Sequence, residues 1–161
     1  MKIKEVMNAP AITCRPEDNL NTAAQLMWEN DCGAIPVVND DNELVGILTD
    51  RDICMAAYTQ GHPLRAIVVQ NAMARQVFTC RADDSLQNAE QLMSEKQIRR
   101  LPVVDGDARI IGVISLNDIA RYAASARPGD SFERELTNTM AAICEPRPHA
   151  QPLTPEPAVP A

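Results

Sequence analysis

Apolar residues follow a helical period in one early stretch of the chain and gather in short runs after it. Positions i, i+3, i+4, i+7 and i+8 from residue 20 are apolar, which predicts a helix with Asn19 as its N-cap. Apolar runs at 34–38 and 44–48, separated by the turn residues 40–42, predict two strands. A second helix is predicted over 50–58, and Gly61-His62-Pro63 ends it.

The same pattern returns 66 residues later. Residues 5–58 align with residues 71–124 without a gap, and nineteen of the 54 aligned positions are identical. The second copy predicts a strand at 77–80, a helix at 85–96, strands at 101–104 and 110–114, and a helix at 117–125. With a first strand at 11–14, each copy has the order strand, helix, strand, strand, helix. We therefore expect an α/β (α+β) fold of two copies related by a pseudo-twofold axis, because neighbouring repeats bury their apolar faces together.

The remaining segments complete the expected organisation. Residues 1–62 form the first copy and residues 63–126 the second, with a small extra strand at 66–69 in the linker. After a break at 127–130, Ser131 is expected to cap a further helix within the segment 127–144. The apolar positions of that helix are Phe132, Leu136, Met140 and Ile143. Residues 145–161 contain six prolines and little to bury, which predicts a disordered tail.

Charge and composition exclude several classes of partner. A net charge of −7 and an aromatic content of 3% argue against a nucleic-acid binder, which needs clustered Lys and Arg and stacking platforms. No apolar run approaches the roughly 20 residues that span a bilayer, and the lysines at the N-terminus precede no signal-peptide core. We expect a soluble, cytoplasmic protein with no membrane partner.

The five cysteines form no framework, because they are widely spaced, odd in number and contain no C-x-x-C pair. We expect free, buried thiols. Cys14 and Cys80 occupy equivalent positions in the two copies, so a redox or disulfide role stays open. His62 and His149 have no partners at metal-ligand spacing, and no nucleophile–base set is present, so we expect no metal, no cofactor and no enzyme activity.

Two equivalent motifs, Thr49-x-x-Asp52 and Ser115-x-x-Asp118, stand at the start of the last helix of each copy. Their spacing is that of a capping box, in which each side chain satisfies an open backbone N–H group. A binding role is the alternative.

The binding role draws support from glycines three residues upstream of each hydroxyl, Gly46 and Gly112. A glycine lets other groups approach the backbone closely next to a helix N-terminus, which favours anions. A carboxylate at this place suits a ribose diol better than a phosphate, because it accepts hydroxyl hydrogen bonds and repels phosphate.

The complete pattern resembles a known family. Each copy contains a Thr, a helix, the motif Pro-Val-Val-[Asn/Asp] and then Gly-h-h-[Thr/Ser]-x-x-Asp-Ile, where h is apolar. This pattern, present twice over residues 5–124, resembles a tandem pair of CBS domains, the Bateman module. Within that family the chain is similar to stand-alone bacterial CBS pairs, including the mycobacterial hypoxic-response type. The resemblance implies that adenosine nucleotides or S-adenosylmethionine bind in clefts between the copies, and that the pair forms a homodimer.

The resemblance also implies two pseudo-symmetric sites. The first uses Val113 against adenine and Ser115 and Asp118 on the ribose. It is completed from the other copy by Thr13 and by the backbone of Cys32, Gly33 and Ala34. The second uses Ile47, Thr49 and Asp52 together with Thr79 and Ile98.

The two sites are expected to be unequal. Arg99 and Arg100 precede the Pro-Val-Val strand of the second copy, where basic residues of the family reach phosphates, whereas Gly33 and Ala34 occupy these positions in the first copy. Alternatively, the two arginines are solvated or paired with a neighbouring carboxylate. Asn117 is a further candidate for ligand binding. Arg51, which stands at the equivalent position of the first copy, compensates there or forms a surface salt bridge.

The sequence thus favours a non-catalytic regulatory module that senses AMP, ADP, ATP or S-adenosylmethionine and acts through its dimer or an unidentified effector protein. The alternative is a structural or protein-interaction CBS pair with no bound ligand.

Overall fold

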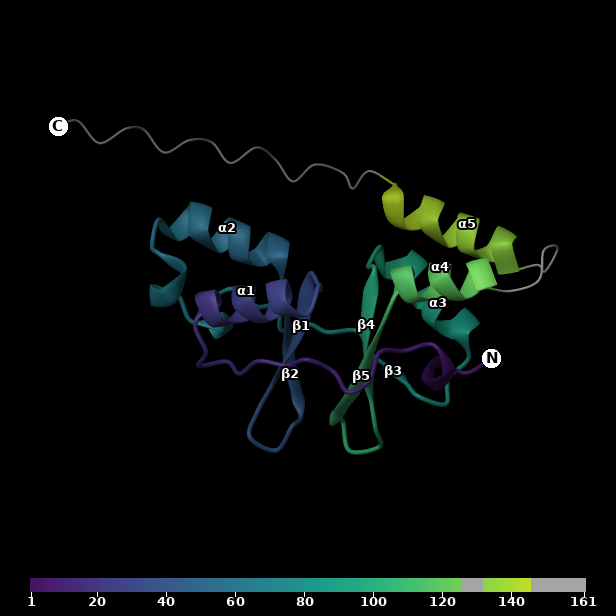
Figure 1. Ribbon diagram of the computed structural model, residues 1–161, viewed down its shortest axis with the longest axis horizontal. Coiled ribbons are helices and arrows are strands. Elements are labelled where there is room, and N and C mark those ends of the chain that lie inside the picture. The colour runs from purple at the N-terminus through teal and green to yellow at the C-terminus, as the bar shows by residue number, and fades with distance from the viewer. Residues whose placement is uncertain (126–131, 146–161) are drawn as a thin grey trace.

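The computed structural model describes residues 1–125 and 132–145 and consists of two similar halves side by side (Figure 1). The first half holds α1 (Leu20–Glu29), β1 (Ala34–Val38), β2 (Leu44–Thr49) and α2 (Asp50–Gln60). The second half holds β3 (Cys80–Arg81), α3 (Leu86–Lys96), β4 (Arg100–Val104), β5 (Ile110–Ser115) and α4 (Leu116–Ser125). Helix α5 (Phe132–Cys144) follows, and three 3₁₀ turns, η1 (Ile3–Glu5), η2 (Leu64–Ala66) and η3 (Val69–Asn71), lie in the connecting segments.

The strand pairing confirms that the two halves are equivalent. Strands β1 and β2 are antiparallel with Val37 opposite Gly46, and β4 and β5 are antiparallel with Val103 opposite Gly112. Both hairpins shift register at the last valine of the Pro-Val-Val motif. The predicted mixed fold, with helix, strand, strand and helix repeated in this order in two halves, is therefore the fold observed.

Three predicted strands differ from the structure. The segment 11–14 forms only a bridge from Cys14 to β1, and the strand predicted at 77–80 is limited to Cys80–Arg81, parallel to β4. The apolar segment 66–69 is not a strand, because its backbone forms only an isolated bridge to the loop before α1: Leu20 donates to the Ile67 carbonyl and Val69 donates to the Asp18 carbonyl. Ile67 and Val69 are nonetheless buried, whereas Ala66 is exposed, so apolar content predicted the burial of these two residues correctly and strand structure wrongly.

The segment that precedes each half packs onto the other half. Ile3 is fully buried in the core of the second half, where its N–H donates to the Asp84 carbonyl. Reciprocally, Ile67, Val69 and Met73 complete the core of the first half. In Figure 1 the N-terminal segment runs from the second half to the first past β5 and β2, and so links the two halves.

Helix α5 lies on α3 and α4 in the second half (Figure 1). Ile143 is buried and Leu136 packs against the same core, as their helical spacing predicts, whereas Met140 is 45% exposed. The expected cap Ser131, the break at 127–130 and the expected tail from 146 onward lie outside the described residues. Across the described parts of the chain, no helix combines the length and apolar character needed to cross a membrane.

The five cysteines differ in burial. Cys14 and Cys80 lie in the two equivalent cores, where burial raises the pKa of each thiol to about 12. Cys54 and Cys144 are exposed, so the expectation of buried thiols is wrong for these two. All five are free thiols.

Candidate functional site

The Thr49 and Ser115 motifs both form capping boxes. The Asp52 N–H donates to Thr49 Oγ1 at 3.1 Å, and the Thr49 N–H donates to Asp52 Oδ2 at 2.9 Å. The same pair of bonds joins Ser115 and Asp118 at 3.3 and 2.8 Å. The motifs therefore stabilise the N-termini of α2 and α4 whether or not a ligand binds there.

The glycines upstream of these caps are approached by the protein's own chain. A Cβ on Gly112 would lie 2.8 Å from the Asn8 carbonyl oxygen and 2.9 Å from Met7 Sδ. In the first half a Cβ on Gly46 would lie 2.6 Å from Met73 Sδ. The close approach that we expected from a ligand is thus made by the protein's own chain, by residues 7–8 at Gly112 and by residues 73–74 at Gly46. The interpretation of the two glycines is corrected accordingly.

A cleft of about 400 Å³ lies between the halves, in front of Ser115. Of the residues predicted for the first site, it brings together Cys32, Gly33, Ala34, Val113, Ser115 and Asp118, and it adds Asn117 and Arg100. Thr13 does not line it: this threonine lines a separate cleft of about 300 Å³ beside Arg15 and Asp40, and Ile12 faces the main cleft instead. We refer to the 400 Å³ space as the ribose cleft.

The carboxylate of Asp118 is almost fully buried and heavily bonded. Oδ2 accepts from the N–H and hydroxyl of Ser115, and Oδ1 accepts from Asn8 Nδ2 at 2.8 Å and from the Arg121 guanidinium. The side chain of Asp118 is 3% exposed, whereas that of Arg121 is 73% exposed. Asn8 and Arg121 were missed by the sequence analysis.

A local signal could have identified Arg121, since it lies one helical turn beyond Asp118 at i+3. Asn8 lies 110 residues away from Asp118, so nothing in its neighbourhood points to the contact.

The residues of the second predicted site are not assembled in the same way. Ile47, Thr49, Asp52, Thr79 and Ile98 line none of the three clefts described for the resolved parts of the chain. Ile47 exchanges backbone hydrogen bonds with Ala74, Ile98 packs against the second core, and Thr79 is exposed. These five residues therefore do not face the three clefts named here, and the inequality of the two sites stays a prediction.

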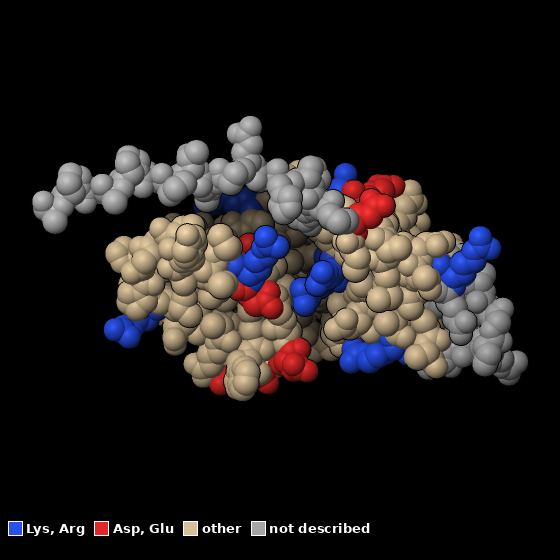
Figure 2. Space-filling view, turned by 90° about the horizontal axis from the view of Figure 1, so that it is seen from above, with Lys and Arg blue, Asp and Glu red and all other residues tan. Residues whose placement is uncertain are grey.

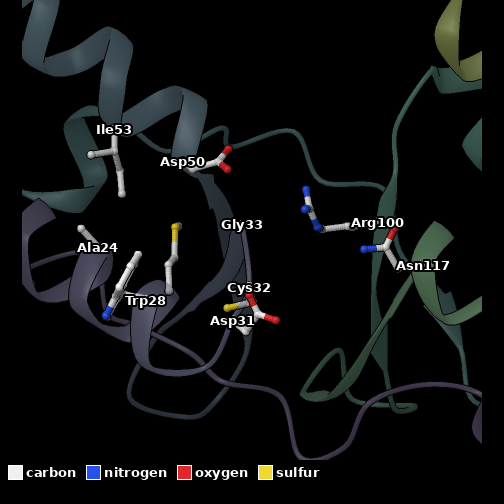
Figure 3. Close-up of a pocket in the computed structure, with 10 residues that line it drawn as sticks. Ala24, Trp28, Asp31, Cys32, Gly33, Asp50, Ile53, Arg100 and Asn117 are labelled. Atoms are coloured by element: carbon white, nitrogen blue, oxygen red, sulfur yellow. The ribbon is translucent and has the colours of Figure 1, made fainter.

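A second space of about 510 Å³, which we call the arm cleft, adjoins the ribose cleft. The two share Asp31, Cys32, Gly33, Arg100 and Asn117. The arm cleft continues along α1 and α2, where its wall is formed by Ala24, Met27, Trp28, Asp50 and Ile53 (Figure 3). Seen from above, the molecule is hollowed between its halves, and side chains of both charges gather there (Figure 2).

The two arginines that precede the Pro-Val-Val strand separate in the structure. Arg100 is partly buried and lines both clefts, whereas Arg99 is exposed and lines neither. Arg51 is likewise exposed and lines neither. The pKa of the Cys32 thiol, between the clefts, is raised by burial, and a backbone hydrogen bond with Ala34 and the charge of Arg100 oppose this effect. Only Arg100 of the three arginines is placed to contact a ligand in these clefts.

Comparison with known proteins gives consistent matches over most of the chain. The family model described as CBS domain matches residues 3–58 and 67–125. The chain is 33% identical to Hypoxic response protein 1 of Mycobacterium tuberculosis over 144 residues, which is 89% of this chain and 94% of the relative.

The crystal structure of Hypoxic Response Protein I with two coordinated zinc ions matches 76% of this chain and 98% of its own, with a TM-score of 0.69 and 33% identity. Among the residues described here, no group of three or more His, Cys, Asp and Glu side chains is placed to hold a metal ion.

Two further structures contain adenosine compounds. The CBS domain pair of protein MJ0100, in complex with 5′-methylthioadenosine and S-adenosyl-L-methionine, has a TM-score of 0.72 and 26% identity, covering 79% of this chain and 98% of its own. The structure of CBSX2 in complex with AMP has a TM-score of 0.68 and 26% identity, covering 77% and 96%.

Proposed function

Because the chain belongs to the CBS-domain family, of the same type as the mycobacterial hypoxic response protein, we propose that it is a regulatory, non-catalytic module that binds an adenosine compound in the ribose cleft. The observation that carries the proposal is the convergence of Val113, Ser115 and Asp118 from one half with residues 32–34 from the other around a single cleft. The adenosine compounds bound by MJ0100 and CBSX2 support the same ligand class.

Each lining group has a chemical task in this proposal. Val113 offers an apolar surface to the adenine, and the backbone at 32–34 offers hydrogen-bonding groups to its edge. Asp118 accepts hydrogen bonds from the ribose hydroxyls. For this to happen, one donor on Oδ1 has to leave. Arg121 is the group able to do so, because its side chain is largely exposed and regains hydration when it turns outward.

A ligand held in this way would couple the two halves, since its contacts come from both. Regulation then requires that the ligand bind one arrangement of the halves more tightly than another. The output would pass through a dimer or through an effector protein.

One observation favours the alternative, an interaction protein without a ligand. Asp118 already accepts four hydrogen bonds from the protein, so its burial is explained without a ribose. Alanine variants of Asp118 and Asp52 separate the two functions.

We also propose that the chain is a homodimer that pairs through α1 and α2. Helix α5 packs on α3 and α4, whereas α1 and α2 of the first half carry two exposed aromatic side chains, Trp28 (89% exposed) and Tyr58 (79% exposed). Replacing both by serine is expected to convert a dimer to a monomer in sedimentation velocity, because the aromatic anchors would be lost. A wild-type monomer at 100 µM would contradict the pairing.

The binding proposal is tested with a matched pair of arginine variants. We expect AMP at 100 times its dissociation constant to stabilise the wild type by about 2.7 kcal/mol, visible as a raised melting temperature. Arg100→Ala should weaken AMP binding about tenfold, because a charged hydrogen bond to the phosphate is lost.

Arg99→Ala is the control, since it removes an equal charge outside the clefts and should leave the AMP affinity within about twofold of wild type. An unchanged melting temperature with AMP, 5′-methylthioadenosine and S-adenosylmethionine would contradict the proposed function.

A further inference from the structure

Opposite charges face one another where the ribose cleft opens into the arm cleft. Arg100 Nη2 and Asp50 Oδ2 lie 3.1 and 2.8 Å from the point that a Cβ on Gly33 would occupy. They point toward each other from opposite halves across this glycine (Figure 3). Asp31, which lines both clefts, adds a second carboxylate at the same junction. A ligand arm that leaves the ribose cleft here meets one guanidinium and two carboxylates.

The pseudo-symmetric position in the second half cannot form the same arrangement, because the two copies of the repeat differ at the residues that make it. Asp50 stands where the second half has Leu116, and Gly33 stands where it has Arg99. Gly33 leaves the space that both charged groups enter, so a side chain at this position would displace one of them. Asp50 is fixed at the first residue of α2, where its N–H donates to the Gly33 carbonyl and Oδ1 accepts from the Arg51 N–H at 2.7 Å. Its Oδ2 is thereby directed at the junction.

We propose, on the basis of the function above, that the 5′ arm of the bound adenosine compound carries positive as well as negative charge, and that Asp50 is the residue that selects it. A sulfonium amino-acid arm, as in S-adenosylmethionine, has two cations and one anion. It complements two carboxylates and one guanidinium. Met27 and Ile53 beyond the junction offer apolar contact to its methylene groups.

A polyphosphate arm fits the same surface less well. Each phosphate that approaches Arg100 also approaches Asp50 and Asp31, and like charges at such distances repel. The arginine therefore supports one anionic group, whereas further negative charge is opposed.

The experiment is isothermal titration calorimetry of the full chain with four probes: S-adenosylmethionine, uncharged 5′-methylthioadenosine, AMP and ATP, in EDTA. Wild type should bind S-adenosylmethionine at least tenfold more tightly than ATP. Asp50→Asn should weaken S-adenosylmethionine about five- to tenfold and strengthen AMP and ATP by a similar factor, because one charge at close range is worth about this much at a hydrated site. Binding of 5′-methylthioadenosine should stay within twofold.

Asp41→Asn is the control, since it removes an equal charge from an exposed turn outside the three clefts and should change none of the four affinities. ATP binding that exceeds S-adenosylmethionine binding in the wild type, or equal effects of Asp50→Asn on all four probes, would overturn the charge selection while leaving the function intact. Tight ATP binding that appears only with added Mg²⁺ and is lost in Asp50→Asn would overturn it too, because the carboxylate would then recruit a cation. Failure of all four probes to bind would instead contradict the proposed function.

Discussion

Replacing Gly112 by alanine is expected to lower the free energy of unfolding by about 2 to 3 kcal/mol. The new Cβ would overlap the backbone carbonyl of Asn8 at 2.8 Å, and a backbone group cannot turn away as the end of a side chain can. The N-terminal segment would have to move outward, which weakens the two 2.9 Å hydrogen bonds between Asn8 and Val113. Urea unfolding followed by circular dichroism measures the change.

Two other glycine-to-alanine variants provide reference values for this loss of unfolding free energy. Gly106→Ala introduces a Cβ with no atom within 4 Å, so the free energy of unfolding should stay within about 0.5 kcal/mol of wild type. Gly46→Ala should fall between the two, because its nearest neighbour is the flexible Met73 side chain and the Ala74 carbonyl is 3.1 Å away. If Gly112→Ala unfolds like Gly106→Ala, the N-terminal segment is not held against β5 as the structure describes.

The contact between Asn8 and β5 illustrates which parts of the fold could be predicted from the sequence. The repeat and the period of apolar residues follow from each half's own side chains, so the helices and the two hairpins were predicted nearly to the residue. The exchange of entering segments depends on contacts such as Ile3 with Asp84, which join residues far apart in sequence. The segment 66–69 shows the limit clearly: its apolar side chains indicated burial, but its backbone bonds to the loop before α1 decided its shape.

The candidate site divides in the same way. Capping boxes are local, and the spacing of Ser115 and Asp118 was sufficient to predict theirs. The choice between Arg99 and Arg100 was not accessible from their adjacent positions, because it depends on where β4 begins: Arg100 is its first residue, whereas Arg99 precedes it. Asn8 and Asp50 were missed for a further reason, which is that their contacts come from the other half. Asn8 meets Asp118 because the N-terminal segment packs on the second half, and Asp50 faces Arg100 because the second half lies opposite α2.

Replacing Asp118 by alanine is expected to weaken binding of 5′-methylthioadenosine at least 30-fold if the carboxylate holds the ribose. The substitution removes the acceptor of two ribose hydroxyls and leaves the buried space uncharged. It also removes a capping-box partner, which should lower the free energy of unfolding by about 1 kcal/mol. Calorimetry at a temperature where the variant stays folded measures the affinity separately from this loss.

Asp52→Ala provides the matched comparison, because Asp52 forms the equivalent capping box in the first half and lines none of the described clefts. Asp118→Ala should lose more stability than Asp52→Ala, because it also leaves Asn8 and Arg121 without their acceptor, and only Asp118→Ala should lose the ligand. Equal retention of the ligand by both would mean that the caps serve the fold alone, and the interaction protein would then be the better description. Loss of affinity in Asp52→Ala would instead place the ligand in the first half, against the cleft described here. The distinction depends on one buried carboxylate that already has four protein donors and has to exchange at least one of them for a ribose hydroxyl.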